Sequence, residues 1–300
     1  MEQPTIVIRG LSKAYGGNKV LHDLTLTIPQ GMFGLLGRNG AGKTTLLRSI
    51  ATLLRVQSGE ITVCGAPVER AREVRRLIGY LPQDFSMYGG MTVREALDYL
   101  GVLSGMDGAA RRQRIPLVLQ QVHLTDQQGK RVRALSGGMK QRLGVAQALL
   151  HQPKVLIVDE PTAGLDPEER VRLRNLLCEA AEDRIVLLST HIVGDIEATC
   201  ERLAILDAGR LLFQGEASAL LRSAEGRVYQ RTVARSELPR LKRAFTVAGV
   251  LSQGERVTAR LLSDQPVEGA EPCAPCLEDA YLLCLQSDGR KGGDGIDPVR

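Results

Sequence analysis

The sequence predicts an α/β fold, and three features carry that prediction. Residues 155–158 and 185–188 are continuous apolar runs, as expected for strands that are buried on both faces. A helical pattern over residues 166–183 separates the two runs, and this alternation favours parallel strands in one sheet. Earlier in the chain, a glycine-rich stretch at residues 37–45 stands between a short apolar strand and a helix.

The N-terminal part of the chain is expected to form short antiparallel strands. Residues 5–9 and 24–28 alternate between apolar and polar side chains, as half-buried strands do, and a turn lies at residues 15–18. The following elements are a strand at 32–36, a helix over 44–54, a strand at 59–63, a short helix at 70–76 and a strand at 78–81.

Residues 84–150 change character and are predicted to be helical. Thr92 and Glu95 have the spacing of a capping box, which opens a helix that reaches about residue 104. A second helix is expected over residues 111–122, where Pro116 would break or shorten it. A third helix begins after residues 136–138 and places apolar side chains on one face.

The α/β pattern then resumes and ends near residue 216. Asp166 provides an N-cap and Pro167 a favourable first residue for the helix that follows the run at 155–158. Two further strands at 203–206 and 211–213 close a first domain of residues 1–216. The remaining segments are predicted as a small α+β domain at 217–286, with a hairpin turn at 253–255 and a last helix at 275–285, and a disordered tail at 287–300.

Composition predicts a cytoplasmic protein. No stretch approaches the roughly 20 apolar residues of a membrane span, and the N-terminus lacks the basic and apolar regions of a secretory signal. The charge of +5 raises the possibility of a nucleic-acid partner, but aromatic residues make up only 3% and Trp is absent. A solvated basic surface, or one near anionic lipid headgroups, fits better, so no nucleic-acid partner is expected.

Six scattered cysteines do not form a recognisable framework. Cys273 and Cys276 have the C-x-x-C spacing with Cys284 beyond them, but no histidine follows His191. Zinc needs four ligands, and disulfides are rare in cytosolic chains of this size. A metal site and a redox pair therefore remain minor alternatives to bystander thiols.

The glycine-rich stretch matches the phosphate-binding pattern G-x-x-x-x-G-K-[ST] in the strand–loop–helix setting that the pattern requires. Its glycines allow the backbone to turn tightly around an anion, and the following helix presents free N–H groups to the same phosphates. Lys43 would reach the terminal phosphates, and the Thr44 hydroxyl would bind Mg²⁺. This motif predicts a nucleoside triphosphate site without deciding the reaction.

Two carboxylates at another strand end are expected beside the phosphate loop. Asp159 and Glu160 directly follow the apolar run at 155–158, and ligands bind beyond the carboxyl ends of parallel strands. Asp159 would hold Mg²⁺, and Glu160 would orient or deprotonate the attacking water. A second anion site is expected at Ser136, Gly137 and Gly138, which open a helix with a hydroxyl and free N–H groups.

With these motifs in this order, residues 5–216 resemble the nucleotide-binding subunit of ATP-binding-cassette (ABC) transporters. The resemblance implies a P-loop NTPase fold of the ABC type, with a mixed sheet core, an antiparallel β subdomain and an inserted helical subdomain at about residues 84–150, to which the small α+β extension is added. It also implies that Tyr15 stacks on adenine, that Gln83 lies near Mg²⁺ and the water, and that His191 faces the γ-phosphate. The cofactors implied are ATP and Mg²⁺.

The residues implied by this resemblance fall into three sets. Those expected to bind ATP are Tyr15, Gly37, Asn39, Gly40, Ala41, Gly42, Lys43, Thr44, Thr45, Ser136, Gly137 and Gly138. Those expected to act in catalysis are Gln83, Glu160 and His191, and those expected to bind metal are Thr44, Gln83 and Asp159.

Members of this family close two such domains head to tail, each ATP lying between one phosphate loop and the partner's Ser136 loop. With one set of motifs, this chain is expected to need a second copy or a paralogue, and a homodimer is favoured. Its motif sequences, including Met139 directly after Ser136, Gly137 and Gly138, resemble those of exporter ATPases of the daunorubicin-resistance type. Those ATPases work with a separate membrane permease. Phe85, Met87 and Tyr88 are candidates to contact that permease, unless they only pack the helical subdomain.

This resemblance predicts a peripheral protein on the cytoplasmic side of the membrane that powers export of a drug, an antibiotic or a lipid-like molecule. Two alternatives remain: an ABC importer subunit, and a soluble ABC ATPase that acts on nucleic acid or the ribosome.

Overall fold

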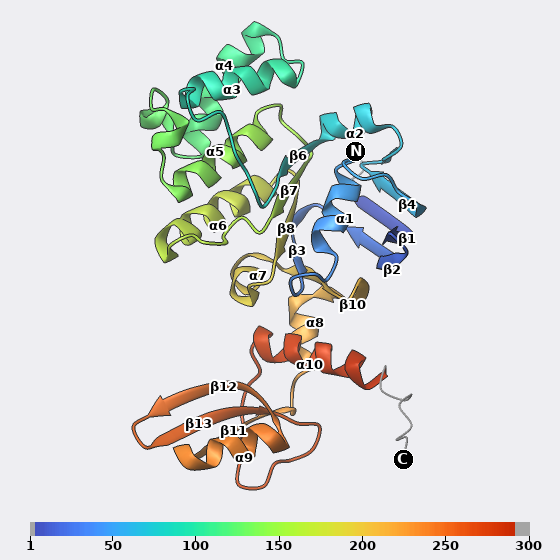
Figure 1. The fold of residues 1–300 in the computed structure, drawn as a ribbon, viewed down its shortest axis with the longest axis vertical. Helices are drawn as coiled ribbons and strands as arrows, with labels where there is room; N and C mark the ends of the chain where they lie inside the picture. Colours follow the sequence, from blue (N-terminus) through green and yellow to red (C-terminus); the bar gives the residue numbers. More distant parts are fainter. Residues whose placement is uncertain (1–3, 292–300) are drawn as a thin grey trace. The chain divides into compact units, whose positions relative to one another are not determined.

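The computed structural model describes residues 4–291 (Figure 1). The chain divides into two compact units, one made of residues 4–200 with Leu206–Leu211 and the other of Glu201–Ile205 with residues 212–291. The predicted boundary at residue 216 lies a few residues after this division, at the end of strand β10. Among the helices of residues 4–291, none combines the length and the apolar composition that crossing a membrane requires.

A six-stranded mixed sheet forms the centre of the α/β fold, in the order β10-β9-β3-β8-β7-β6. Strands β3, β8, β7 and β6 pair in parallel, so their carboxyl ends lie along one edge. Every residue of β7 and β8 is buried, which explains the continuous apolar runs in the sequence. The bounds are β3 Gly31–Leu36, β6 Ile78–Leu81, β7 Val155–Asp159, β8 Ile185–Thr190, β9 Arg202–Asp207 and β10 Arg210–Glu216.

Three helices pack against strands β3, β7 and β8: α1 Lys43–Ile50, α6 Pro167–Ala181 and α7 Val193–Thr199. Helix α6 begins as the sequence predicts, because the Asp166 side chain accepts a hydrogen bond from Glu169 N at 2.9 Å and Pro167 occupies the first turn. Its apolar face is buried through Leu173, Leu176 and Leu177. The helices therefore cover the sheet but leave its carboxyl edge to the loops.

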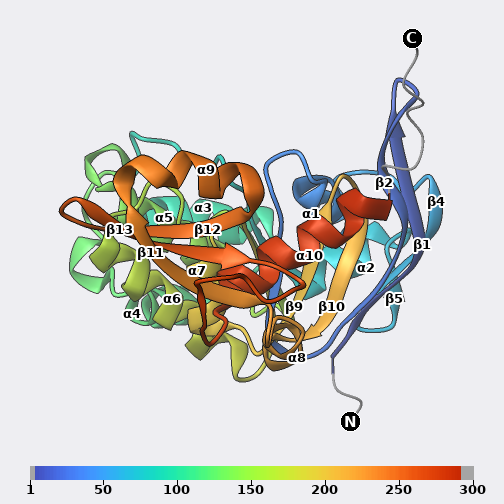
Figure 2. The ribbon, with the colours of Figure 1, turned by 90° about the horizontal axis from the view of Figure 1, so that it is seen from below.

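An antiparallel sheet in the order β2-β1-β4-β5 forms the predicted β subdomain. Its strands are β1 Ile6–Tyr15, β2 Asn18–Ile28, β4 Ser58–Val63 and β5 Ala66–Pro67, and helix α2 Ala71–Leu77 follows them. Figure 2 shows β1 and β2 as one long ribbon. Gly16 and Gly17 both have positive φ at the turn of this ribbon, as a two-residue hairpin of matching twist requires.

The inserted helical subdomain contains α3 Val93–Leu103, α4 Gly108–Gln121 and α5 Gly137–Leu149, with short 3₁₀ turns at Thr125–Gln127 and Val132–Ala134. The capping box is present, because Thr92 Oγ1 accepts from Glu95 N at 3.2 Å and Glu95 Oε2 accepts from Thr92 N at 2.8 Å. The expected break at Pro116 is wrong, since α4 runs through it. Pro116 and Arg112, whose carbonyl loses its donor, are both exposed, so water can satisfy that carbonyl.

A close contact between α5 and β6 yields a prediction for stability. A methyl group added at Gly79 of β6 would lie 2.1 Å from the Ala148 carbonyl oxygen of α5, which is a backbone atom that cannot rotate away. We expect Gly79→Ala to lower the free energy of unfolding by about 1–3 kcal/mol, as overpacking does. Urea denaturation measures this change in the free energy of unfolding. Gly194→Ala is the control, because open space surrounds that position in α7. Equal stability of both variants would contradict the contact.

The C-terminal unit carries a second antiparallel sheet in the order β12-β13-β11-β14. Helix α9 contacts β12 (Figure 2). The core of this unit includes Tyr229, Val233, Leu241, Val257 and Leu261. This arrangement agrees with the α+β extension predicted from the sequence, and Gly254 supplies the positive φ of the expected hairpin. The elements are α8 Ala217–Arg222, β11 Val228–Ala234, a 3₁₀ turn at Arg235–Glu237, α9 Leu238–Ala244, β12 Thr246–Gln253, β13 Arg256–Leu262, β14 Glu271–Pro272 and α10 Leu277–Lys291.

The predicted tail does not begin where the sequence suggested. Helix α10 continues past Ser287 to Lys291, so disorder from residue 287 is wrong for its first residues, and residues 292–300 lie outside the described part. The Ser287 hydroxyl donates to Leu283 O at 3.0 Å, and burial of Leu283 and Leu285 holds this turn. The polar composition after residue 286 does not predict a helix, because the buried leucines that stabilise this helix lie before that polar segment.

The C-x-x-C pair lies at the start of α10 and has no disulfide. Asp279 caps this helix by accepting from Cys276 N at 2.8 Å, and Arg260 Nε donates to the same carboxylate. Burial raises the pKa of the Cys273 and Cys276 thiols. No cluster of three or more metal-ligating side chains occurs within residues 4–291. A raised pKa keeps a thiol protonated, and a protonated thiol is a weak nucleophile.

Candidate nucleotide-binding site

Four strand ends bring the predicted residues together at the carboxyl edge of the sheet. The parallel register pairs Leu36 with Thr190 and Asp159 with Ser189, so the segments that follow β3, β8 and β7 emerge side by side. A cavity of about 300 Å³ lies here. It is lined by Val20, Arg38, Asn39, Gly40, Gly42, Lys43, Thr44, Thr45, Gln83 and Glu160.

The glycines of the loop have the backbone geometry that the motif requires. Gly40 has a φ of 82° and Gly42, which caps α1, a φ of 101°, both in the region that favours glycine. At Gly37 an added methyl group would lie 2.3 Å from Leu206 O. The loop therefore needs glycine at these positions to adopt this conformation. Together with the free N–H groups at the start of α1, it forms a site suited to an anion.

Lys43 is held inside this loop and is buried. Its Nζ donates to Gly37 O at 2.6 Å and to Arg38 O at 3.2 Å, and it forms an ion pair with Glu160 Oε1 at 3.2 Å. Two carbonyls and a carboxylate thus compensate a buried ammonium. An anionic phosphate in the loop would offer the same compensation, so Lys43 is placed to exchange Glu160 for a phosphate.

Asp159 and Thr44 form the part of the site that fits a divalent cation. The Thr44 hydroxyl donates to Asp159 Oδ2 at 2.8 Å, while Asp159 Oδ1 is buried without a hydrogen-bond partner among residues 4–291. Burial raises the pKa of the Asp159 carboxyl, because its anion has lost water. A carboxylate, a hydroxyl and the amide of Gln83 are the hard oxygen donors that Mg²⁺ prefers, and substrate phosphates usually complete such a shell. The donor set therefore fits Mg²⁺.

Glu160 connects the phosphate loop to His191. Its backbone has a φ of 50°, unusual for a residue with a side chain, and is held by the hydrogen bond from its N–H to Ser189 O at 2.9 Å. Glu160 Oε2 lies 2.7 Å from His191 Nδ1 and also accepts from His191 N at 3.4 Å. With Nδ1 as the donor, the neutral imidazole keeps Nε2 as an acceptor.

Tyr15 and the Ser136 loop lie outside this cavity. Tyr15 ends β1 with its ring 45% exposed and Lys13 Nζ 5.5 Å from the ring centroid. Ser136 caps α5, because its Oγ accepts from Met139 N at 3.2 Å. Open space surrounds Gly137, whereas a methyl group at Gly138 would lie 2.3 Å from Glu169 Oε2. Residues 136–138 therefore begin α5 as a capped turn that lies outside the cavity around Lys43.

Sequence reasoning missed two residues of the cavity. Val20 of β2 and Arg38 both line it, although neither was a candidate. Arg38 occupies a variable position of the phosphate-binding motif, so the motif alone could not select it. Val20 comes from the antiparallel subdomain, and only the approach of β2 to α1 brings it to the loop. No local pattern in the sequence signals such a contact.

Comparisons with known proteins agree with this geometry. The model of the ABC transporter family matches residues 21–163. The Nod factor export ATP-binding protein I of Paraburkholderia xenovorans is 41% identical over 232 residues, which span 75% of each chain. An uncharacterized ABC transporter ATP-binding protein of Bacillus subtilis is 39% identical over 227 residues, covering 75% of this chain and 76% of the relative.

Solved structures lead to the same family. An ATP-binding subunit of an ABC transporter superposes with a TM-score of 0.65 at 31% identity, covering 73% of this chain and 92% of that one. CbiO1 of Clostridium perfringens, part of the ABC transporter complex cbiONQ, gives a TM-score of 0.66 at 25% identity over 81% and 99% of the two chains. These matches confirm the predicted fold class and the predicted ATP hydrolase activity. The chain belongs to the ABC transporter family and carries that family's ATP-binding, ATP-hydrolysing domain.

Proposed function

We propose that this chain is the ATPase subunit of an exporter, on the cytoplasmic side of the membrane, and acts through a separate permease. The observation that supports the ATPase role most is the contact of Glu160 with both Lys43 and His191. Export is supported by relatives whose names describe export ATP-binding proteins. Those names specify Nod factor for the relatives; for this chain we propose a drug, an antibiotic or a lipid-like molecule as cargo. The daunorubicin-type assignment stays a proposal.

In this proposal each residue has a stated task. The loop glycines and Lys43 bind the ATP phosphates, and Thr44, Asp159 and Gln83 hold Mg²⁺, which supplies charge neutralisation at the transferring phosphate. Glu160 orients the attacking water and accepts its proton, and His191 positions Glu160 through the 2.7 Å contact. Tyr15 stacks on the adenine.

The Ser136 loop takes part from a second chain. Ser136, Gly137 and Gly138 start a helix with free N–H groups, yet none of them lines the cavity of their own chain. In a head-to-tail dimer they would close the partner's cavity over the phosphates. We propose a homodimer in which each site consists of the phosphate loop of one chain and the Ser136 loop of the other.

An apolar patch on the helical subdomain is our candidate for the permease contact. Tyr88 and Tyr99 meet edge to face at a centroid distance of 5.6 Å, and their side chains are 63% and 37% exposed. Val102 of α3 is also exposed. Phe85 instead packs on α5, since its ring lies 3.0 Å from a methyl group added at Gly144. Exposed aromatic clusters of this kind mark protein contacts.

The test is whether a membrane permease co-purifies with this chain from cell membranes. We expect Tyr88→Ser/Tyr99→Ser to reduce the recovered permease about tenfold, because exposed aromatic pairs dominate such interfaces. Leu251→Ser is the control, since Leu251 is equally exposed but lies on β12. Undiminished permease recovery with the double variant would contradict the patch. Retention of RNA or ribosomes through high salt, in place of a permease, would contradict the transport function itself.

A further inference from the structure

Lys13 is a buried lysine of β1 that lies outside the phosphate loop. It is 7% exposed, and no carboxylate pairs with it within residues 4–291. Its Nζ donates a hydrogen bond to Arg55 O at 2.8 Å and lies over the Tyr15 ring, 5.5 Å from the ring centroid. A buried ammonium without a counter-charge costs stability, so its presence at this position indicates a task beyond packing.

This ammonium occupies one face of the Tyr15 ring. The residue is otherwise 45% exposed, and its hydroxyl makes no hydrogen bond within the described part of the chain. An aromatic face attracts a cation within about 6 Å through the negative charge of its π system. The contact with Lys13 therefore favours one orientation of an exposed ring, and it leaves the opposite face of that ring for stacking.

A side chain at the start of the neighbouring strand fixes the backbone that carries the ring. The β1–β4 ladder ends where Ser12 pairs with Ser58. Beyond that pair, Gln57 Oε1 accepts from Ala14 N at 2.8 Å, and Gln57 Nε2 donates to Ala14 O at 3.1 Å. The Gln57 amide thus replaces the next two hydrogen bonds of the ladder, and the backbone stays extended up to Tyr15.

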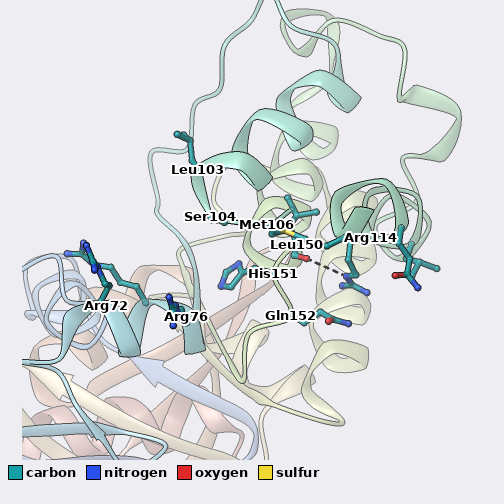
Figure 3. A pocket seen from close by; sticks show the side chains of 14 residues that line it. Arg72, Arg76, Leu103, Ser104, Met106, Arg114, Leu150, His151 and Gln152 are labelled. Carbon is teal, nitrogen blue, oxygen red and sulfur yellow. Dashed lines mark hydrogen bonds between the residues drawn. The ribbon is translucent and has the colours of Figure 1, made fainter. Parts of the chain in front are cut away.

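The segment that provides both supports is attached to α1, the helix that begins at the phosphate loop. Residues 51–57 directly follow this helix. Helix α2 holds the same segment, because Arg75 Nε donates to Thr52 Oγ1 at 2.8 Å. The neighbouring side chains Arg72 and Arg76 of α2 line a separate cavity (Figure 3). The two supports therefore belong to the part of the fold that carries the phosphate loop.

The other strand of the ribbon brings this ring to the nucleotide cavity. Val20 is the extra residue of a bulge in the β1–β2 pair, and its neighbour Leu21 lies opposite Lys13. Val20 lines the cavity, and a methyl group added at Gly42 would lie 2.7 Å from Leu21 Cδ2. Strand β2 therefore packs directly on the phosphate loop at the level of Lys13.

We propose that Lys13 is a positioning residue for the base of the bound nucleotide. This inference rests on the proposed function, in which Tyr15 stacks on the adenine. Lys13 covers one face of the Tyr15 ring and leaves the other face to the base, while Gln57 fixes the backbone beside the ring. Because the ring is already oriented, stacking costs less side-chain entropy than it would with a freely rotating ring.

Calorimetric titrations with Mg²⁺–ADP and with Mg²⁺–pyrophosphate test this inference, because only ADP carries the base and neither ligand has a γ-phosphate. We expect Lys13→Met, which keeps the side-chain length and removes the ammonium, to weaken ADP binding about five- to tenfold. Pyrophosphate binding should change less than about twofold. Lys13→Arg keeps a cation at the ring and should bind ADP within about twofold of the wild type. Gln57→Leu should weaken ADP binding about threefold, because it removes both hydrogen bonds to Ala14.

A double-mutant cycle shows whether Lys13 acts through the ring. Tyr15→Ala alone should weaken ADP binding about tenfold, as the loss of a stacking aromatic does. In the Tyr15→Ala background, Lys13→Met should cause no further loss, since the ring that it orients is gone. Lys154→Met is the matched control, because Lys154 is an exposed lysine before β7, at the end of that strand away from the site. It should change neither affinity.

Equal losses of ADP and pyrophosphate affinity in Lys13→Met would show a general structural effect and would overturn the inference. Additive losses in the double variant would overturn it as well, because Lys13 would then act independently of Tyr15. Unchanged ADP binding by Lys13→Met, with weakened binding by Tyr15→Ala, would contradict the role of Lys13 and leave the proposed function standing. If Tyr15→Ala binds ADP as the wild type does, the stacking role in the proposed function fails, and this inference fails with it.

Discussion

Glu160→Gln is expected to reduce ATP turnover by about 10²- to 10⁴-fold, the usual contribution of a positioned general base. ATP binding should survive, because the amide is isosteric and the loop around Lys43 is unchanged. Removing the carboxylate also leaves Lys43 without the partner that lies 3.2 Å away, so a phosphate no longer competes with Glu160 for this ammonium. We therefore expect tighter ATP binding and an ATP-bound dimer that persists.

Two measurements check this expectation, ATP hydrolysis at saturating ATP and dimer mass by light scattering. In the absence of nucleotide the variant should melt at a lower temperature, since a buried ammonium has lost its counter-charge, and Mg²⁺ with ATP should restore it. Glu168→Gln is the control, because Glu168 is an exposed residue of the neighbouring helix α6. Near-normal hydrolysis by Glu160→Gln would remove Glu160 from the catalytic step.

The second large effect on ATP hydrolysis is expected from variants of the two parts of the proposed composite site, which are the phosphate loop of one chain and the Ser136 loop of the other. Lys43→Ala removes the buried ammonium that would compensate the phosphates, and should abolish ATP binding and turnover. Ser136→Ala removes the hydroxyl proposed to close the partner's site, and should abolish turnover while ATP still binds to the phosphate loop. ATP binding by filter assay separates these two phenotypes.

Ser136 also has a structural task that this experiment must separate from catalysis. Its Oγ caps α5, so Ser136→Ala is expected to cost about 1 kcal/mol of stability. Gly137→Arg keeps the cap and introduces bulk where open space surrounds the glycine, so it alters the proposed contact with much less effect on the subunit's own packing. Full activity of Gly137→Arg would contradict a role for this loop in a composite site.

The sequence could predict those parts of the site that local patterns encode. Asp159 and Glu160 follow a buried apolar run, and the glycine-rich loop precedes a helix, so the general rule about parallel strand ends was enough to place them together. The position of Gln83 beside the loop is explained in the same way, because β6 pairs with β7.

What the sequence missed depends on contacts between distant segments. The helix break expected at Pro116 was wrong because the sequence does not show that this side of α4 is exposed to solvent. Val20 reaches the nucleotide cavity only because β2 packs near α1.

Mixing the two inactive variants tests the central claim, that a second chain completes each nucleotide site. A dimer of one Lys43→Ala chain and one Ser136→Ala chain has one site with both defects and one site with neither. With random assortment half of the dimers are mixed, so the expected ATP hydrolysis is roughly one quarter of the wild-type rate if sites act independently. Recovery of that activity is the result predicted here. A mixture as inactive as its two components, although mixed dimers form, would contradict the composite site.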